Sequence, residues 1–367
     1  MKQASQSGRI GVCQIAVPEE RRLALWYVGL DVHQSQSSFC VLDGNGKVVK
    51  RMQVRGHCSK LIDVVEELPR PFVICYEASC GYGYLYDRLR KVARRVVVAH
   101  PGQLRLIFRS KKKNDRVDAK KLATLLFLDQ VPPVYVPSID VRSWRSLIDF
   151  RHRLVAKRTR AKNGLRSLCR GHGIALPSAK RLWTRKGRKR LAEQVFATLP
   201  SGLQRDLLLD ELEYFDRRIT QVEKGLKTLA DGHPGVSLLR SIPGVGPRTA
   251  EAIVAYIDKA QRFSRNKTLG SYFGLVPCQD QSAGSNRLGH ITQEGPATVR
   301  KLLVEAAWQG IRRSAHIRAY FQRVQAADPN RKKVALVATA HYLVRVMHAM
   351  LRTGEMWRYD QKEKTAA

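Results

Sequence analysis

The chain has 367 residues, and 66 lysines and arginines against 31 aspartates and glutamates give it a formal net charge of +35. The excess positive charges repel one another, which favours a polyanionic partner. Hydrophobic residues make up 44% of the chain, which is typical of globular domains and not of a disordered basic tail. Length and composition therefore predict two or three folded domains that bind nucleic acid, and they argue against a binder of acidic substrates.

A membrane is the second polyanionic candidate, and the sequence argues against it. The most apolar stretch, Val334 to Leu351, contains His341, Arg345 and His348, which are too polar for a hydrocarbon span. The first 20 residues lack the apolar run of a signal peptide. Seven cysteines without CxxC spacing favour reduced thiols in a cytoplasm over a disulfide framework or a zinc site. We expect no membrane partner.

An alternating α/β pattern follows about 25 residues that carry no periodic signal. Apolar runs at 26–31, 38–43 and 47–52, with Gly44-Asn-Gly46 before the last, predict a meander of three strands. Helices and strands then alternate, with a helix at 59–67, a strand at 72–77, a helix from residue 82 and a strand at 95–99. This order is typical of a ribonuclease-H-like domain.

The middle of the chain is helical and strongly basic. Residues 142–190 hold 17 lysines and arginines and one acid, Asp149. Apolar residues recur at heptad spacing, first at Leu147, Leu154, Ala161 and Leu168, and then at Leu208, Leu212, Phe215, Ile219, Val222, Leu226 and Leu229. The two seams predict an antiparallel helical hairpin or an oligomerising coiled coil, and an amphipathic helix pair in a local bundle is the alternative.

A third region begins after Gly235. The segment from Ile242 to Ile253 resembles a helix-hairpin-helix element, in which Gly244 and Gly246 allow a turn whose amides hold a DNA phosphate. A tight structural turn is the alternative. Loop-like sequence is expected over 274–295, followed by two helices at about 296–313 and 332–352.

Four acids stand out by their placement. Asp31 and Glu77 each end a predicted strand, and a ribonuclease-H-like sheet would set those strands side by side. Asp115 and Asp118 lie three residues apart at a helix start and face one way. A single acid in such a place is more often the cap of a helix or the end of a strand. Four carboxylates that converge need cations to balance their charge. Two Mg²⁺ ions held by them would stabilise the attacking and leaving oxygens at a phosphodiester.

These residues carry a resemblance. The segments Gly29-Leu-Asp-Val-His33, Tyr76-Glu-Ala-Ser79 and Asn114-Asp-Arg-Val-Asp-Ala119 resemble the DEDD motif of the IS110 group of insertion-sequence transposases. Three later segments resemble the C-terminal domain of the same transposases, namely Ile242-Pro-Gly-Val-Gly246, Tyr272-Phe-Gly-Leu-Val-Pro277 and Gly289-His-Ile-Thr292. The resemblance runs from about Trp26 to Arg352, with the motifs in the expected order.

The resemblance implies a RuvC-like DEDD domain, a coiled coil and a helical C-terminal transposase domain. The boundaries would be an N-terminal arm over 1–25, then 26–137, 138–232 and 233–355, with a tail over 356–367. Such proteins resemble DNA recombinases that use a structured noncoding bridge RNA to choose donor and target DNA. A bacterial cytoplasm, with association with the nucleoid when DNA is bound, is the expected location.

The resemblance also implies a nucleophilic serine in the C-terminal domain. By its motif position this is Ser282, in Gln281-Ser-Ala-Gly284. The family often shows two adjacent serines before a glycine, so Ser285 is a rival, and a plain loop hydroxyl is the alternative for either. Attack by Ser282 would leave a phosphoserine–DNA link, and Mg²⁺ at the acids, for which Mn²⁺ can substitute, would assist.

Partners and rival functions complete the interpretation. The heptad seam favours a dimer or a tetramer. The residues expected to bind nucleic acid are Arg181, Arg185, Lys186, Arg188, Lys189, Arg190, Gly244, Gly246 and Arg287. The main rival is a RuvC-like Mg²⁺-dependent structure-specific nuclease, in which water attacks and no covalent intermediate forms. A non-catalytic nucleic-acid scaffold is the other, and it leaves the placement of the four acids unexplained.

Overall fold

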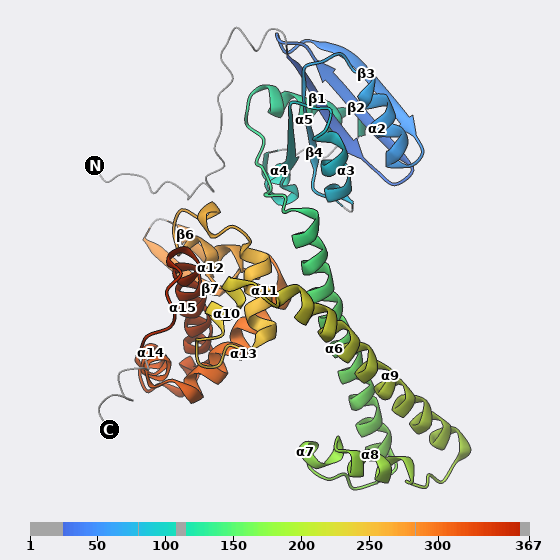
Figure 1. Ribbon diagram of the computed structural model, residues 1–367, viewed down its shortest axis with the longest axis vertical. Coiled ribbons are helices and arrows are strands. Elements are labelled where there is room, and N and C mark those ends of the chain that lie inside the picture. Colours follow the sequence, from blue (N-terminus) through green and yellow to red (C-terminus); the bar gives the residue numbers. More distant parts are fainter. Residues whose placement is uncertain (1–24, 80, 108–114, 283, 360–367) are drawn as a thin grey trace. The chain divides into compact units, whose positions relative to one another are not determined.

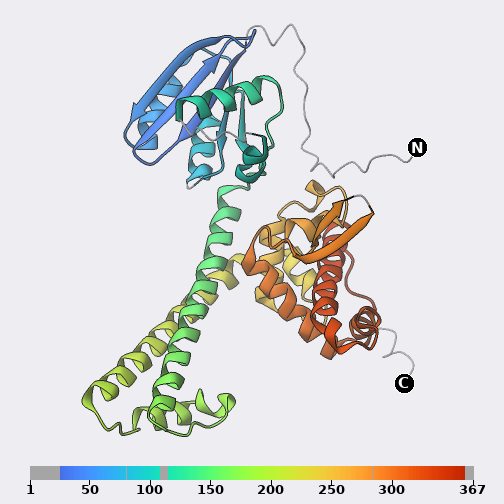
Figure 2. The same cartoon turned by 180° about the vertical axis from the view of Figure 1, so that it is seen from behind.

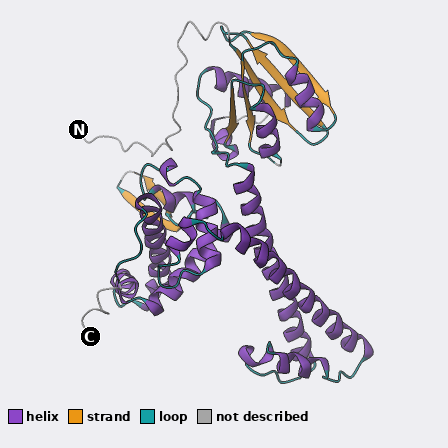
Figure 3. Cartoon of the chain, viewed as in Figure 1, coloured by secondary structure: helices purple, strands orange, loops and turns teal. Residues whose placement is uncertain are grey.

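The computed structural model describes residues 25–79, 81–107, 115–282 and 284–359, except for the side chains of Asp115 and Arg116. The chain forms two compact units that divide after Ile139. The first contains a five-stranded sheet with helices, and the second is mainly helical with one small two-stranded sheet (Figures 1 and 3). The expectation of an α/β part followed by a helical part is confirmed at this level.

The sheet of the N-terminal unit has the order β3-β2-β1-β4-β5. Strands β1, β2 and β3 form an antiparallel meander, whereas β4 and β5 run parallel to β1. The strands are β1 (Trp26–Val32), β2 (Gln36–Leu42), β3 (Val48–Arg55), β4 (Phe72–Glu77) and β5 (Arg95–Ala99). The predicted meander and the predicted pairing of the strand of Glu77 with the first strand are both confirmed.

Helices cover both faces of this sheet, because side chains alternate along each strand. On β1, Val28 and Leu30 face α2 (Cys58–Glu66) and α3 (Tyr82–Leu89) in one core. Tyr27 belongs to the opposite core, with Cys75 of β4, and this core is covered by α4 (Pro101–Ile107) and α5 (Asp115–Phe127).

Helix α5 lies directly on β1 at Gly29. A Cβ atom at Gly29 would overlap the carbonyl oxygen of Ala119 and the backbone nitrogen of Ala123. Tyr27 contacts the far end of the helix through Phe127, with ring centroids 5.2 Å apart and edge to face. The missing side chain of Gly29 therefore sets the distance between the helix and the sheet.

The C-terminal unit begins with two long antiparallel helices, α6 (Ile139–Gly171) and α9 (Leu199–Ala230) (Figure 1). Two ion pairs show the antiparallel register. Arg151 of α6 pairs with Glu223 of α9, and Arg158, further along α6, pairs with the earlier residue Asp216 of α9. The predicted seam is largely confirmed, with Leu212, Ile219 and Leu226 buried along α9. It is wrong at its last position, because Leu229 is 49% exposed and the neighbouring Ala230 is buried instead.

Two short helices, α7 (Ala179–Leu182) and α8 (Arg185–Ala192), join α6 to α9 and form a small folded tip (Figure 2). Leu182 and Leu191 of these helices pack with Cys169 of α6 in a small core of their own. Gly187 allows the corner, because a Cβ there would overlap the carbonyl oxygens of Arg181 and Leu182. The basic segment between the long helices is therefore folded around an apolar centre.

The rest of the C-terminal unit packs around one large core. Its helices are α10 (Pro234–Leu239), α11 (Pro247–Ile257), α12 (Thr268–Tyr272), α13 (Ala297–Arg313), α14 (Ala315–Gln325) and α15 (Lys332–Thr353). Helix α15 is long and apolar enough to cross a membrane, but Leu343, Val344 and Met347 are fully buried in this core. It therefore packs as a core helix of the unit.

Two elements of this unit differ from the expectations. The segment expected to be a loop over 274–295 contains an antiparallel hairpin, β6 (Pro277–Ser282) and β7 (Ser285–Ile291). All but one of the residues in the two strands are exposed. The sequence therefore shows no alternation of apolar and polar residues that would predict these strands. Helix α14 was also missed between the two predicted C-terminal helices.

We expect Gly29→Ala to destabilise the N-terminal unit by at least about 1–3 kcal/mol, because the new methyl group meets rigid helix backbone. Hydrogen exchange of α5 and urea unfolding measure the effect. Gly202→Ala in α9 is the matched control, since nothing lies within 4 Å of the added Cβ. That substitution should be neutral or slightly stabilising. Equal protection of α5 in wild type and Gly29→Ala would contradict the close-packing argument.

Candidate active site and nucleic-acid interface

Asp31 and Glu77 lie at the same edge and on the same face of the sheet. Leu30 is paired with Tyr76 in the parallel ladder, so the two acids follow at the next positions of neighbouring strands. Each lies two residues beyond a position that faces α5, namely Gly29 on β1 and Cys75 on β4. Both carboxylates therefore project on the face that α5 covers.

The third described acid, Asp118, lies on the helix that covers this face. It precedes Ala119, whose carbonyl oxygen lies against Gly29, and Gly29 is two residues before Asp31 on β1. Asp115 begins α5 one turn earlier, and its side chain lies outside the described residues. The backbone thus brings Asp31, Glu77 and the start of α5 to one side of the sheet.

The described carboxylates are accessible, and two of them lie beside a nitrogen of a basic side chain. The side chain of Asp31 is 18% exposed, with one oxygen 3.3 Å from Nε2 of His33. Asp118 is 33% exposed and accepts a hydrogen bond of 3.0 Å from Nζ of Lys121, and Glu77 is exposed. Among the described residues, which do not include the Asp115 side chain, no three acidic, histidine or cysteine groups form a ready metal cluster. The donor chemistry suits a hard cation such as Mg²⁺.

The cysteines near this site play a different part. Cys75 is fully buried opposite Gly29, and burial raises the pKa of its thiol to about 12. A thiol held protonated in this way is a poor nucleophile, so the interpretation of Cys75 as a small buried side chain holds. Cys80 lies outside the described residues.

Ser282 and Ser285 face each other across the closed end of the β6–β7 hairpin. Both serines are exposed, as are the neighbouring residues of both strands. Directly paired residues share a face in an antiparallel ladder, and faces alternate from one pair to the next. The pair next to the serines, Gln281 with Asn286, is on the other face, and the pair after it, Asp280 with Arg287, is on the same face as Ser282 and Ser285. The hairpin therefore presents two hydroxyls at its tip and a cation two residue pairs away on the same face.

The turn between α10 and α11 uses its two glycines differently. Gly244 has φ +94° and lies against α13, because a Cβ there would overlap the backbone of Gln309 and Gly310. Gly246 is exposed, and nothing lies within 4 Å of a Cβ placed on it. Pro247 occupies the first position of α11 and has no N–H to offer. Close packing thus accounts for Gly244, while only Gly246 lies open to a ligand.

The basic residues of the tip are mostly exposed. Arg181, Arg185, Lys186, Lys189 and Arg190 project from α7 and α8, whereas Arg188 is half-buried and pairs with Asp216 at 2.7 Å. Lys189 lies 3.6 Å from Glu193. Five of the six predicted tip residues are therefore placed to meet a polyanion, and Arg188 also holds α8 to α9.

An open hollow of ≈ 580 Å³ lies beside the tip, and its lining is part cationic and part apolar. Arg166 and Arg170 come from α6, and Ile174, Leu176 and Leu182 come from the segment that follows it. Trp183 borders this region with Lys162 and Arg166 over its ring, 5.0 and 5.4 Å from the centroid. These residues were not among the predicted nucleic-acid contacts, although they lie in or beside the strongly basic segment of the sequence.

The base of α6 is fastened to α11 by charged and polar groups. Arg145 donates hydrogen bonds to the carbonyl oxygens of Ala255 and Tyr256, at 2.8 and 3.1 Å. Tyr256 in turn donates from its hydroxyl to Asp149 at 2.7 Å. Asp149, the one acid of the basic segment, thus serves to join the long helices to the core of the C-terminal unit.

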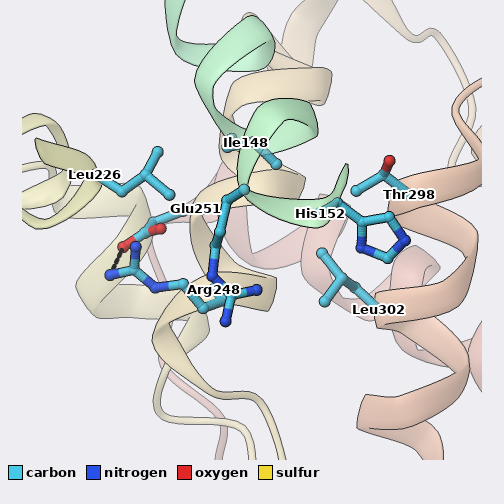
Figure 4. A pocket seen from close by; sticks show the side chains of 8 residues that line it. Ile148, His152, Leu226, Arg248, Glu251, Thr298 and Leu302 are labelled. Carbon is cyan, nitrogen blue, oxygen red and sulfur yellow. Dashed lines mark ion pairs between the residues drawn. The ribbon is translucent and has the colours of Figure 1, made fainter. Parts of the chain in front are cut away.

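A cavity of ≈ 10 Å³, room for about one water, lies at this junction (Figure 4). Glu251 of α11 is 1% exposed and pairs with Arg248 at 2.7 Å. Its second oxygen and Nη1 of Arg248 have no hydrogen-bond partner among the described residues. Burial raises the pKa of Glu251 to about 7.

Two family models match most of this molecule. A model for DEDD transposases of the IS110 type matches residues 28–173, and one for the transposase IS116/IS110/IS902 family matches residues 236–322. The chain is 28% identical over 349 residues to a probable family 20 transposase of Pseudomonas aeruginosa. That alignment covers 90% of this chain and 98% of the relative. The chain is 26% identical over 298 residues to the transposase for insertion sequence element IS1111A of Coxiella burnetii, spanning 80% and 81%.

Strand-end carboxylates together with a strongly basic helical surface are typical of enzymes that act on nucleic-acid phosphodiesters. The chain belongs to the IS110 family of insertion-sequence transposases, which are enzymes that cut and rejoin DNA. The first model spans all four predicted acids, and the second spans both serines and the turn at Gly244. The resemblance stated from the motifs is confirmed.

We expect the stability of the wild-type C-terminal unit to fall as the pH rises from about 4.5 to about 7, relative to Glu251→Gln. The folded state holds a proton on Glu251 in this range and the unfolded state does not, so the free energy of unfolding falls by an amount on the order of 1–3 kcal/mol. Denaturant unfolding at several pH values measures this. Glu213→Gln, an exposed carboxyl on α9, should retain the wild-type slope. A Glu251→Gln profile parallel to wild type would contradict the assignment.

Proposed function

We propose that the protein is a DNA recombinase that cuts and rejoins the strands of an insertion sequence through a covalent bond between Ser282 and DNA. The observation that carries the proposal is the position of Ser282, at the tip of an exposed two-stranded hairpin. A nucleophile that attacks a duplex must reach a phosphate without the rest of the fold colliding with the DNA. The buried serines Ser37 and Ser38 have no such access.

The serine step exchanges one phosphodiester for another. Oγ of Ser282 bonds to phosphorus while the bond from phosphorus to a sugar oxygen breaks, and the hydroxyl proton replaces the lost bond on that oxygen. A sugar hydroxyl of the second strand later reverses the exchange and releases the serine. Bond number and type are conserved, so no nucleotide cofactor is needed. Arg287 and, less directly, His290 on β7 are placed to contact the phosphate.

The four acids form the proposed metal site, with Asp31, Glu77, Asp115 and Asp118 as ligands of two Mg²⁺ ions. When bound, these ions neutralise charge at the scissile phosphate and favour the ionised hydroxyl. Support comes from the shared face and edge of Asp31 and Glu77 and from the close contact of α5 with β1. Lys121, which lies 3.0 Å from Asp118, compensates part of the negative charge.

We further propose that a structured bridge RNA selects donor and target DNA, with the enzyme acting in the bacterial cytoplasm at the nucleoid. The cationic tip supports this, because Arg181, Arg185, Lys186, Lys189 and Arg190 lie exposed on a small folded platform. The turn at Gly244 and Gly246 would act as a helix-hairpin-helix element, with Gly246 as its open position.

Assembly of copies is also part of the proposal. Helices α6 and α9 would form a coiled coil, and α9 carries a second apolar stripe beside its buried seam. Leu199, Leu203, Leu207 and Tyr214 are 87%, 57%, 57% and 45% exposed at roughly helical spacing. Such a stripe is suited to a second copy, which agrees with a dimer or a tetramer.

We expect Ser282→Ala to bind DNA with wild-type affinity but to form no covalent protein–DNA adduct and no rejoined product. The measurement is denaturing gel electrophoresis of labelled DNA after reaction and detergent quench. Ser285→Ala is the matched control, since it lies opposite Ser282 and is equally exposed, and it should still form the adduct. An adduct that survives in Ser282→Ala refutes the assignment. Wild-type cleavage with no adduct would favour the RuvC-like nuclease instead.

We expect Asp31→Asn or Glu77→Gln to lower the rate of strand cleavage by at least about 100-fold, because each removes a metal ligand. A second measurement uses no DNA: Mg²⁺ should raise the melting temperature of the N-terminal unit in wild type and not in these variants. Asp63→Asn, an exposed acid on α2, should behave as wild type in both assays. Full cleavage by Glu77→Gln would remove Glu77 from the site.

A further inference from the structure

A row of aromatic rings lies where α14, α15 and the end of the chain meet, and nothing in the proposed chemistry uses it. His316 of α14 stacks on Tyr359 with ring centroids 4.0 Å apart and planes at 16°. Its Nε2 lies 2.9 Å from the hydroxyl of Tyr342 of α15, and Tyr342 stacks on Tyr320 of α14 at 4.5 Å and 19°. We call Tyr320, Tyr342, His316 and Tyr359 the aromatic row.

The row begins from a firmly anchored segment. After α15 the chain runs back toward α14 (Figures 1 and 2), and Trp357 is 4% exposed in the large core with its backbone N–H bonded to Ser241. Trp357 therefore anchors this segment to the core. Tyr359 follows two residues later, is 59% exposed, and stacks on His316, with the ring of Trp357 edge to face at 5.0 Å.

Two arginines accompany the row. The guanidinium of Arg323 lies over the ring of Tyr320, 5.2 Å from its centroid. Arg358, next to Tyr359, is 70% exposed and lies 3.2 Å from the carboxylate of Glu355. Burial, with Tyr359 and Tyr320 nearby, raises the pKa of Tyr342 to about 12, so the hydroxyl of Tyr342 stays protonated at neutral pH. A partner with flat rings and negative charge suits this surface.

We propose that the aromatic row is a stacking platform for unpaired nucleobases, with Arg323 and Arg358 contacting the backbone of the strand. Exposed aromatic rings beside cations are the usual means of holding single strands, because every base has a π-face. Paired bases keep their faces inside the duplex and cannot use the row. The proposal rests on the proposed function only in that the partner is a nucleic acid with unpaired stretches, and its failure would leave the serine and metal chemistry untouched.

The row also reaches beyond the matched family region. The C-terminal family model ends at residue 322, so Tyr342, Trp357, Arg358 and Tyr359 lie outside it. Half of the platform is thus supplied by the last helix and the segment after it. This placement distinguishes the platform from the serine hairpin, which lies wholly inside the matched residues.

The test is binding of the full-length protein to oligothymidylate and oligouridylate of 12 nucleotides and to a hairpin duplex. Tyr359→Leu should weaken binding of the single strands by about 5- to 150-fold, whereas Tyr359→Trp should keep it. Duplex affinity should change by less than about 2-fold, since duplex binding is dominated by phosphate contacts. A 2-aminopurine base in the strand should lose fluorescence on wild type and Tyr359→Trp but not on Tyr359→Leu.

Tyr84→Leu is the matched control, because Tyr84 of α3 is a tyrosine of similar exposure, 51%, that lies in the other unit of the chain. It should bind the single strands as wild type does. A loss confined to DNA or to RNA supports the platform and identifies its strand. Unchanged single-strand binding by Tyr359→Leu, or equal losses on single strand and duplex, overturns the proposal; an unchanged melting temperature, expected because Trp357 remains, verifies that the variant is folded.

Discussion

Repulsion between like charges is the constraint on which the rest of this structure depends. With 66 basic and 31 acidic residues, most cations have no acidic counterpart and must lie where water screens them. The α6–α9 hairpin and its tip provide part of that surface, with exposed cations on α7 and α8. Three acids of this region, Asp149, Asp216 and Glu223, join one helix to another.

Asp216 shows how one carboxylate does this. It pairs with Arg158 of α6 at 3.1 Å and with Arg188 of α8 at 2.7 Å, so a single residue of α9 joins three helices. Burial opposes ionisation of Asp216, but hydrogen bonds from Arg188 and Arg158 outweigh burial and lower its pKa. Asp149 acts similarly at the other end, through the hydroxyl of Tyr256. Partly buried pairs of this kind are stronger than exposed ones, which are worth little each.

The parts that could be predicted from the sequence are those with a strong local period. The strands of the N-terminal sheet, the turn at Gly46 and the seam of α9 follow from alternation, from turn residues and from heptads. The edge shared by Asp31 and Glu77 followed from the expected strand order. Other features depend on contacts that are distant in sequence: the need for glycine at Gly29 becomes apparent only when α5 lies on β1. The β6–β7 hairpin escaped prediction because its strands bury no face and so carry no period.

Elements packed in a core and elements without one have different roles in this molecule. Elements with a deep core, such as β1, β4 and α5, fix positions. The four acids lie near the ends of these elements, where a rigid backbone limits how far a carboxylate moves. The serine hairpin has no core of its own, and an isolated two-stranded ribbon is marginally stable in water. Its order must then come from the helices at its base or from bound DNA, which makes its tip free to adapt to a substrate. The net charge of +35 by itself indicates only a nucleic-acid partner. The structure adds that five exposed cations lie on a folded tip built around Leu182 and Leu191. A surface whose shape is fixed in this way can recognise the form of a polyanion as well as attract it.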